Sequence, residues 1–114
     1  MPMLKVQTNL AVDAAAGKSF VAEASRTVAV ATGKPETYVM VALEQAVPMM
    51  FAGDTAPLAY LELKSIGLSE SQTAPASKAL CELMHRTLNI PPSRVYIEFA
   101  SASGRMWGYN GTTF

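Results

Sequence analysis

The sequence contains one cysteine, few charged residues and no long apolar run, and each of these shortages excludes a class of protein. The lone Cys81 excludes an internal disulfide and a cysteine-based metal site. The nine lysines and arginines are balanced by nine acidic residues and form no run, which argues against nucleic-acid binding and an electrostatic membrane anchor. No apolar stretch approaches the ~18 residues that a membrane-spanning helix needs, so we expect no membrane partner.

Apolar residues, by contrast, are abundant: they fill half of the 114 positions, and charged residues fill only 16%. An average soluble domain has about 25% charged residues. The length suits a single domain, residues 1–114, whose interior is limited, so we expect part of the apolar surface to meet other subunits. Lys5 interrupts any signal-peptide-like apolar segment, and we expect a cytoplasmic protein whose secretion, if any, needs no signal peptide.

Hydrophobic periodicity predicts four strands. Apolar and polar residues alternate along the first predicted strand, and β-branched and aromatic residues mark the others. The predicted strands are 4–10, 38–43, 58–64 and 95–100.

Two helices are predicted between these strands. Asp13 is a suitable N-cap for the first, and Gly33 stands where a left-handed C-cap is expected. Ser69 and Gln72 have the spacing of a capping box at the start of the second, which is expected to end at Asn89. Each half of the chain therefore forms a strand–helix–strand unit.

Two such βαβ units predict an α/β (α+β) fold. The strands are expected to form one four-stranded mixed sheet, with two antiparallel helices on one face. The other face then needs cover, and the apolar composition suggests that other subunits supply it.

The proline that follows the initiator methionine is the most informative feature of the sequence. A small residue at position 2 favours removal of Met1, so we expect Pro2 to become the first residue. Its nitrogen would be a secondary amine, titrating like an α-amino group with a pKa near ~8 that burial or a nearby cation lowers toward neutrality. That is the pKa range of a general base. Many protein sequences begin with Met-Pro, however, so this dipeptide alone does not identify a catalytic proline.

Several other residues have a simple structural explanation when each is taken alone. His85 is typical of a surface histidine, Lys34 of a cation at a helix C-terminus, and Tyr96 of a strand aromatic. Gly17-Lys18-Ser19 is similar to the end of a phosphate-binding loop, but Val12 stands where that motif needs a glycine.

A set of short segments nevertheless stands in one specific order across the whole chain. The segments are Met1-Pro2-Met3, Thr8-Asn9, Ala31-Thr32-Gly33-Lys34-Pro35, Ser65-Ile66-Gly67, Leu80-Cys81, Arg94-Val95-Tyr96-Ile97 and the ending Thr113-Phe114. Together they resemble the macrophage migration inhibitory factor family of the tautomerase superfamily. The resemblance implies a homotrimer with a central barrel of three sheets and an active site at each subunit interface. It implies keto–enol tautomerisation of phenylpyruvate-type acids and isomerisation of dopachrome derivatives, with no cofactor and no metal.

The resemblance also assigns roles to single residues. Pro2 is the base, Lys34 binds the substrate carboxylate and lowers the pKa of the Pro2 amine, and the backbone amide of Ile66 helps to hold the substrate. Tyr96 and Glu98 come from the neighbouring subunit. Three aromatic residues near the C-terminus are expected to form the pocket wall: Trp107, Tyr109 and Phe114.

Several departures from the family pattern bear on function. Leu58-Ala59-Tyr60-Leu61 stands where vertebrate members carry CxxC, and the tail has Trp107 and Tyr109 in place of a small aliphatic residue and a tryptophan. Glu98 replaces the usual asparagine, and an ionised glutamate there would raise the pKa of the Pro2 amine and oppose an anionic substrate. The segment 11–13 lacks the arginine linked to receptor engagement in vertebrate members, so a protein receptor is left open.

These departures keep two alternative functions open. One is an interaction protein or cytokine mimic with weak or vestigial tautomerase activity, which Glu98 and the altered tail favour. The other is a hydratase, decarboxylase or dehalogenase of the same superfamily, which would place arginines in the pocket. No motif assigns a position to the four arginines Arg26, Arg86, Arg94 and Arg105.

Overall fold

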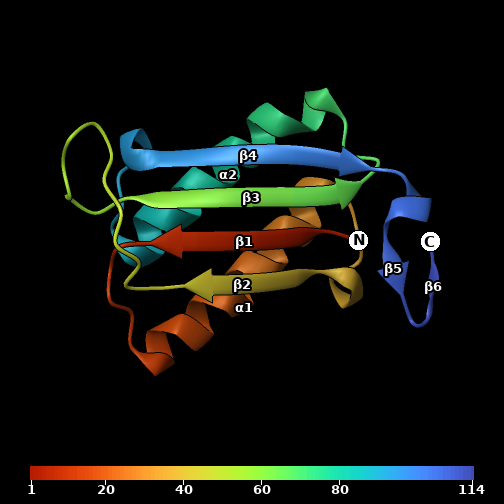
Figure 1. The fold of residues 1–114 in the computed structure, drawn as a ribbon, viewed down its shortest axis with the longest axis horizontal. Coiled ribbons are helices and arrows are strands. Elements are labelled where there is room, and N and C mark those ends of the chain that lie inside the picture. The colour runs from red at the N-terminus through yellow and green to blue at the C-terminus, as the bar shows by residue number, and fades with distance from the viewer.

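The computed structural model describes residues 1–114 and contains one four-stranded sheet with two long helices packed against one of its faces (Figure 1). Strands and helices follow one another in the predicted order. The main elements are β1 (Met3–Thr8), α1 (Ala14–Thr32), β2 (Met40–Glu44), β3 (Ala59–Ile66), α2 (Glu70–Leu88) and β4 (Val95–Ala102).

The sheet is mixed, with the strand order β2-β1-β3-β4. β1 and β2 are parallel, β3 and β4 are parallel, and the two central strands β1 and β3 are antiparallel. Each parallel pair is joined through a helix, because parallel strands need a long crossover. The two helices run in opposite directions behind the sheet in Figure 1, and the predicted fold is confirmed. Neither helix has the length and apolarity needed to cross a membrane.

The helix ends lie at the residues that the sequence predicts. The Asp13 carboxylate accepts a hydrogen bond of 2.8 Å from the backbone N–H of Ala16, and the side chain of Gln72 accepts one of 2.9 Å from the backbone N–H of Ser69. Gly33 and Asn89 both take the left-handed conformation at the C-caps, with φ of 67° and 55°. These caps bond backbone groups that a helix end leaves without partners.

The core lies between the sheet and the helices. Alternate residues of β1 and β3 face the helices and are buried, and they meet one apolar side of each helix. The fully buried Thr8 belongs to this layer, and its hydroxyl donates a hydrogen bond of 2.8 Å to the carbonyl of Leu58. The largest core side chains are Phe20, Leu4, Leu61, Leu63, Leu80, Leu83, Met84 and Ile90.

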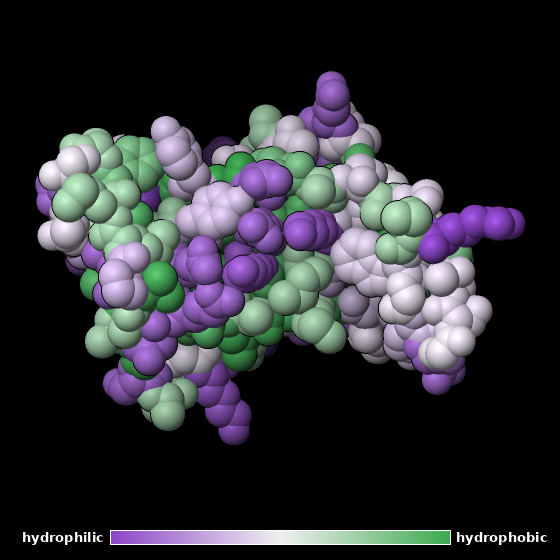
Figure 2. Space-filling view, in the orientation of Figure 1, coloured by the Kyte–Doolittle hydropathy of each residue, from purple (hydrophilic) through white to green (hydrophobic).

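The open face of the sheet is polar at its centre, and the expectation that other subunits cover this face stays a prediction. Figure 2 shows hydrophilic side chains across the centre of this face, with apolar surface above and below them and towards the left-hand end. The large exposed apolar residues lie mainly at the ends of the sheet and in the segments beyond them, apart from Val30 on α1. In β3 the alternation that buries Leu61 and Leu63 turns Tyr60, Glu62 and Lys64 to this open face.

Strand boundaries differ from the predictions by one or two residues, and β2 begins only at Met40 because Tyr38 belongs to the short helix that precedes it. β1 ends at Thr8, two residues earlier than predicted, and the side chain of Asn9 instead donates to the carbonyl of Thr55 at 2.9 Å and accepts from the N–H of Leu58 at 3.0 Å. The remaining elements are short and were not predicted: η1 (Glu36–Tyr38), η2 (Pro92–Arg94), η3 (Gly104–Met106), β5 (Gly108–Tyr109) and β6 (Thr112–Thr113).

Candidate active site

Pro2 lies immediately before β1, at the end of the sheet where the C-terminal hairpin also lies (Figure 1). Its side chain is fully buried, and its carbonyl accepts a hydrogen bond of 3.0 Å from the backbone N–H of Met40 at the start of β2. Pairing with both neighbouring strands begins at Met3. The sheet therefore fixes the position of the backbone that carries the candidate base.

A pocket of about 220 Å³ opens beside the N-terminus. Its wall comes from four parts of the chain: the N-terminus, η1, the start of β2 and the C-terminal tail. Most of the lining is apolar or aromatic: Met1, Pro2, Met3, Thr37, Tyr38, Val39, Met40, Trp107, Gly108, Tyr109 and Phe114. Larger hollows exist elsewhere on the surface, but they are more open and do not contain the N-terminus.

Aromatic rings form one wall of this pocket. The rings of Tyr109 and Phe114 stack with centroids 5.2 Å apart, and the edge of Tyr38 meets them at 6.0 and 5.9 Å. The tail returns to this position because Gly104 leaves room for it: a Cβ there would lie 2.6 Å from the carbonyl oxygen of Phe114. The three aromatic residues predicted for the wall all line the pocket, and Tyr38 is a fourth that the sequence reasoning did not single out.

The N-terminal amine is the group in this pocket with a shifted pKa. In the chain that retains Met1, burial lowers the pKa of the amine, and the positive charge of Lys34 lowers it further. Lys34 stands directly after the C-cap of α1, where its backbone N–H donates to the carbonyl of Ala29 at 3.2 Å. The helix end therefore places a cation close enough to act on the N-terminal amine.

Ile66 lies at this same end of the sheet. It is the last residue of β3, two positions beyond Lys64, which pairs with Met3. In a single chain neither Lys34 nor Ile66 lines the pocket. The N-terminus, Lys34, Ile66 and the aromatic tail are thus gathered in one region, as the sequence predicts for one half of a site.

Tyr96 lies far from this region within the same chain, and Glu98 lies between the two, at the middle of β4, where it pairs with Glu62. Tyr96 pairs with Tyr60, which pairs with Gln7 of β1. The five residue steps from Pro2 to Gln7 span roughly 17 Å along the strand. One chain therefore keeps Tyr96 apart from the pocket, and neither Tyr96 nor Glu98 lines it. Their place in the pocket of a neighbouring chain stays a prediction.

Glu98 makes a contact that the sequence reasoning did not foresee. Its carboxylate accepts a hydrogen bond of 2.7 Å from the hydroxyl of Tyr60, and Glu62 lies 3.3 Å from the same hydroxyl. The hydrogen bond to Glu98, followed by burial and the two negative charges, raises the pKa of Tyr60 to about 12. The register of β3 and β4 creates this group on the open face, because it places Glu62 opposite Glu98.

No arginine lines the pocket beside Pro2. Arg86 forms an ion pair of 3.2 Å with Glu23, and Arg94 donates to backbone carbonyls at the other end of the sheet. The chain also has no group of three or more His, Cys, Asp or Glu side chains placed to hold a metal ion. The groups gathered at the pocket are an amine, which the charge of nearby Lys34 affects, and an aromatic surface.

Comparisons with known proteins agree over the full length of the chain. The model of a family described as "Macrophage migration inhibitory factor (MIF)" matches residues 1–114. Rat macrophage migration inhibitory factor is 38% identical, and the Brugia malayi homolog is 35% identical; each comparison covers 100% of this chain and 99% of the relative.

Solved structures lead to the same family. The crystal structure of the macrophage migration inhibitory factor homologue from Prochlorococcus marinus is 41% identical, with a TM-score of 0.92 and 98% of each chain covered. The structure of the macrophage migration inhibitory factor from Trichinella spiralis is 32% identical, with a TM-score of 0.89 over 98% of this chain and 99% of the other.

Proposed function

This chain belongs to the macrophage migration inhibitory factor family, and from that premise we propose that it is a cofactor-independent keto–enol tautomerase of phenylpyruvate-type acids and a dopachrome-type isomerase. Pro2, freed by removal of Met1, is the base. The observation that carries the proposal is the place of the N-terminus in an apolar, aromatic pocket where the charge of Lys34 acts on its amine.

The proposed reaction moves one proton and needs no cofactor. The ketone of an aryl pyruvate makes the hydrogens on the neighbouring carbon acidic. The neutral amine of Pro2 takes one of these protons, and the electron pair of the C–H bond moves to give an enolate. The resulting ammonium group then returns the proton to the enolate oxygen, which yields the enol and restores the neutral amine.

The other residues bind and orient the substrate in this proposal. Lys34 pairs with the carboxylate, and its charge keeps more of the amine unprotonated near neutral pH. Tyr38, Tyr109 and Phe114 face the aromatic ring of the substrate and exclude water. The backbone amide of Ile66, at the end of the central strand β3, helps to hold the substrate.

We propose a homotrimer in which each site is shared between two chains. The end of one chain that carries Tyr96 meets the end of the next that carries Pro2, and such an arrangement of two different surfaces closes into a ring. Exposed apolar side chains at both ends, including Met40, Met50 and Met106, support this arrangement.

The test of this proposal is a hydroxyphenylpyruvate tautomerase assay on protein of measured size. Light scattering is expected to give about three times the chain mass of 12.1 kDa, and the same fraction is expected to turn over the substrate. A clean monomer at micromolar concentration would contradict the shared site. A trimer whose turnover does not exceed the uncatalysed rate would contradict the proposed reaction.

Replacing Glu98 by asparagine tests whether this residue belongs to the working pocket. If Glu98 of one chain faces the Pro2 amine of the next, removal of its charge is expected to lower both KM and the apparent pKa of the acidic limb of the pH–rate profile. The same variant removes the carboxylate that raises the pKa of Tyr60. A fall in the pKa of Tyr60 with unchanged kinetics would place Glu98 outside the pocket.

A further inference from the structure

Arg94, which no motif explained, holds the loop between β2 and β3. Its Nε donates to the carbonyl of Pro57 at 3.1 Å, and a terminal nitrogen donates to the carbonyls of Asp54 at 3.0 Å and Ala56 at 3.1 Å. Both terminal nitrogens lie 3.3 Å from the carbonyl oxygen of Phe51. The guanidinium group thus binds four backbone carbonyls of one loop, which its planar set of five N–H donors permits.

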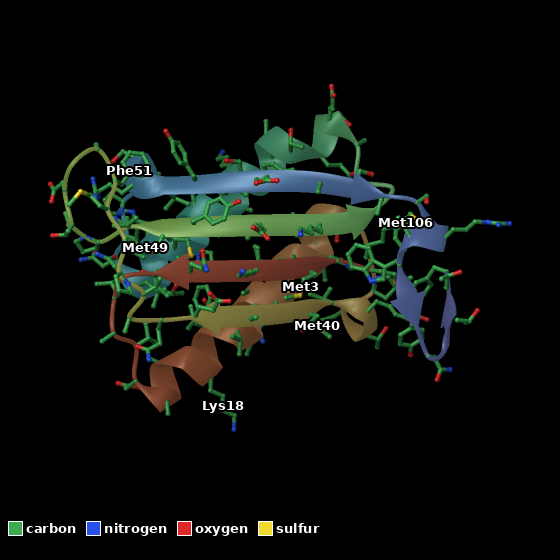
Figure 3. All side chains as sticks on the ribbon, viewed as in Figure 1. Met3, Lys18, Met40, Met49, Phe51 and Met106 are labelled. Carbon is green, nitrogen blue, oxygen red and sulfur yellow. The ribbon has the colours of Figure 1, made fainter.

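The same guanidinium group also lies over an aromatic ring of the loop. Its central carbon is 5.3 Å from the ring centroid of Phe51. The ring of Phe51 packs in turn against Tyr96, with centroids 4.7 Å apart and planes tilted by 48°. Figure 3 shows Phe51 beside the start of β4. Arg94, Phe51 and Tyr96 therefore form a continuous stack at this end of the sheet.

The ring of Tyr96 has little other support. Tyr96 is 66% exposed. Phe51, the ring that it packs against, lies in a tight turn that is closed by two backbone hydrogen bonds of 3.0 Å between Phe51 and Asp54. An exposed tyrosine otherwise samples several rotamers, and a ligand that fixes one of them loses affinity through the lost entropy. A ring already held in place avoids that loss.

We propose that Arg94 is a positioning residue that sets the orientation of Tyr96. By binding the carbonyls around Phe51 and covering its ring, Arg94 holds Phe51 against Tyr96, so that the Tyr96 ring reaches the neighbouring chain's pocket in the orientation that contacts the substrate. This inference rests on the proposed function, because that function gives Tyr96 its contact with the substrate.

The path of the loop does not depend on Arg94 alone. Its first residues are held by backbone bonds from Ala46 to the carbonyl of Leu10 at 2.7 Å and from Val47 to the carbonyl of Thr8 at 3.0 Å. Its last residues are held by the side chain of Asn9. Loss of the guanidinium group is therefore expected to loosen the middle of the loop and leave its ends in place.

The test is Arg94→Lys, with Arg26→Ala as the matched control. Lysine keeps the charge but cannot bind several carbonyls in one plane. Because a hydrogen bond contributes about 1 kcal/mol, we expect KM for hydroxyphenylpyruvate to rise about fivefold. The value of kcat and the acidic limb of the pH–rate profile should not change, since Pro2 and Lys34 are untouched. Arg26 is exposed on α1, and its loss should change none of these values.

Two further variants separate positioning from a general loss of structure. Phe51→Leu keeps the carbonyl bonds but removes the ring contact, and it should raise KM to a similar extent. In a Tyr96→Ala background, Arg94→Lys should cause no additional rise in KM. An unchanged KM in folded Arg94→Lys, or the same additional rise in the Tyr96→Ala background, would overturn the inference.

A measurement that needs no turnover distinguishes failure of this inference from failure of the proposed function. Arg94→Lys should speed amide hydrogen exchange in residues 49–57 and shift the ring resonances of Tyr96. If the parent protein lacks activity, the proposed function fails, and these two signals still decide whether Arg94 orients Tyr96. Unchanged exchange and unchanged resonances would overturn the role of Arg94.

Discussion

Replacing Pro2 by glycine is expected to lower kcat/KM for hydroxyphenylpyruvate at least ~10-fold. A positioned general base contributes ~10²–10⁴-fold in rate, and the expected minimum loss is smaller than that full contribution. Glycine still provides an N-terminal amine, so some activity should remain. The loss arises because the ring of Pro2 is fully buried, and glycine leaves the amine without that packing and with a freer backbone.

The matched control for this variant is Pro75→Ala. Pro75 is exposed on α2, in the helix layer and away from both ends of the sheet that the proposed site uses. It should leave kcat/KM unchanged. Light scattering and circular dichroism on both variants show whether the assembly and the fold persist. Parental activity in a folded Pro2→Gly protein would refute the role of Pro2 as the base.

Replacing Lys34 by alanine is expected to have the next largest effect. A hydrogen bond to a charged group contributes about 1.5–3 kcal/mol, so loss of the pair with the carboxylate should raise KM about 10- to 100-fold. The charge of Lys34 lowers the pKa of the N-terminal amine. Without this charge, the protonated amine is more stable and its pKa rises. The acidic limb of the pH–rate profile should therefore move to higher pH.

Two other variants identify the cause of that effect. Lys34→Arg keeps a positive charge and should leave the acidic limb closer to the parental position than Lys34→Ala does. Lys18→Ala removes an exposed lysine near the start of α1, roughly 24 Å of helix away, and should alter neither KM nor the pH profile (Figure 3). An acidic limb that stays in place in Lys34→Ala would show that this charge does not set the amine pKa during turnover.

The elements that local sequence determines were predicted closely. The helix caps at Asp13, Gly33, Ser69 and Asn89 depend on residue types within a few positions, and all four lie where the sequence places them. The sheet follows from its strands, because a strand–helix–strand unit gives a parallel pair. What these patterns do not contain is the register, which brings the Glu98 carboxylate to the hydroxyl of Tyr60.

The features that were not predicted arise from contacts between distant residues. The C-terminal hairpin depends on a close approach of Phe114 to Gly104, and Tyr38 joins the pocket only because the tail folds back onto η1. The bonds of Arg94 join positions 37 to 43 residues apart, for which a single sequence carries no local pattern. Composition likewise counts apolar residues without placing them, so it did not show that polar side chains such as Glu62 and Lys64 occupy the open face of the sheet.

The part of the candidate site around Pro2 can be checked in a single chain, whereas the part that holds Tyr96 and Glu98 cannot. Pro2 was singled out from the residues themselves, and Lys34 and the aromatic tail were added once the family resemblance was noted; the structure brings the N-terminus and the tail into one pocket, with the charge of Lys34 acting on the amine. Tyr96 and Glu98 were named through the family resemblance, and a single chain places Tyr96 at the other end of the sheet and Glu98 at its middle. Their assignment to the pocket of a neighbouring chain therefore stays a prediction.

The most direct test of the central claim is an intact-mass measurement combined with a steady-state hydroxyphenylpyruvate assay on the same preparation. The claim is that the free secondary amine of Pro2 is the base. A chain that retains Met1 has an amide at this position, and the chain mass shows which form is present. We expect activity in the form that begins at Pro2 and almost none in the form that retains Met1. Equal activity in the two forms, or none in the form that begins at Pro2, would contradict the account.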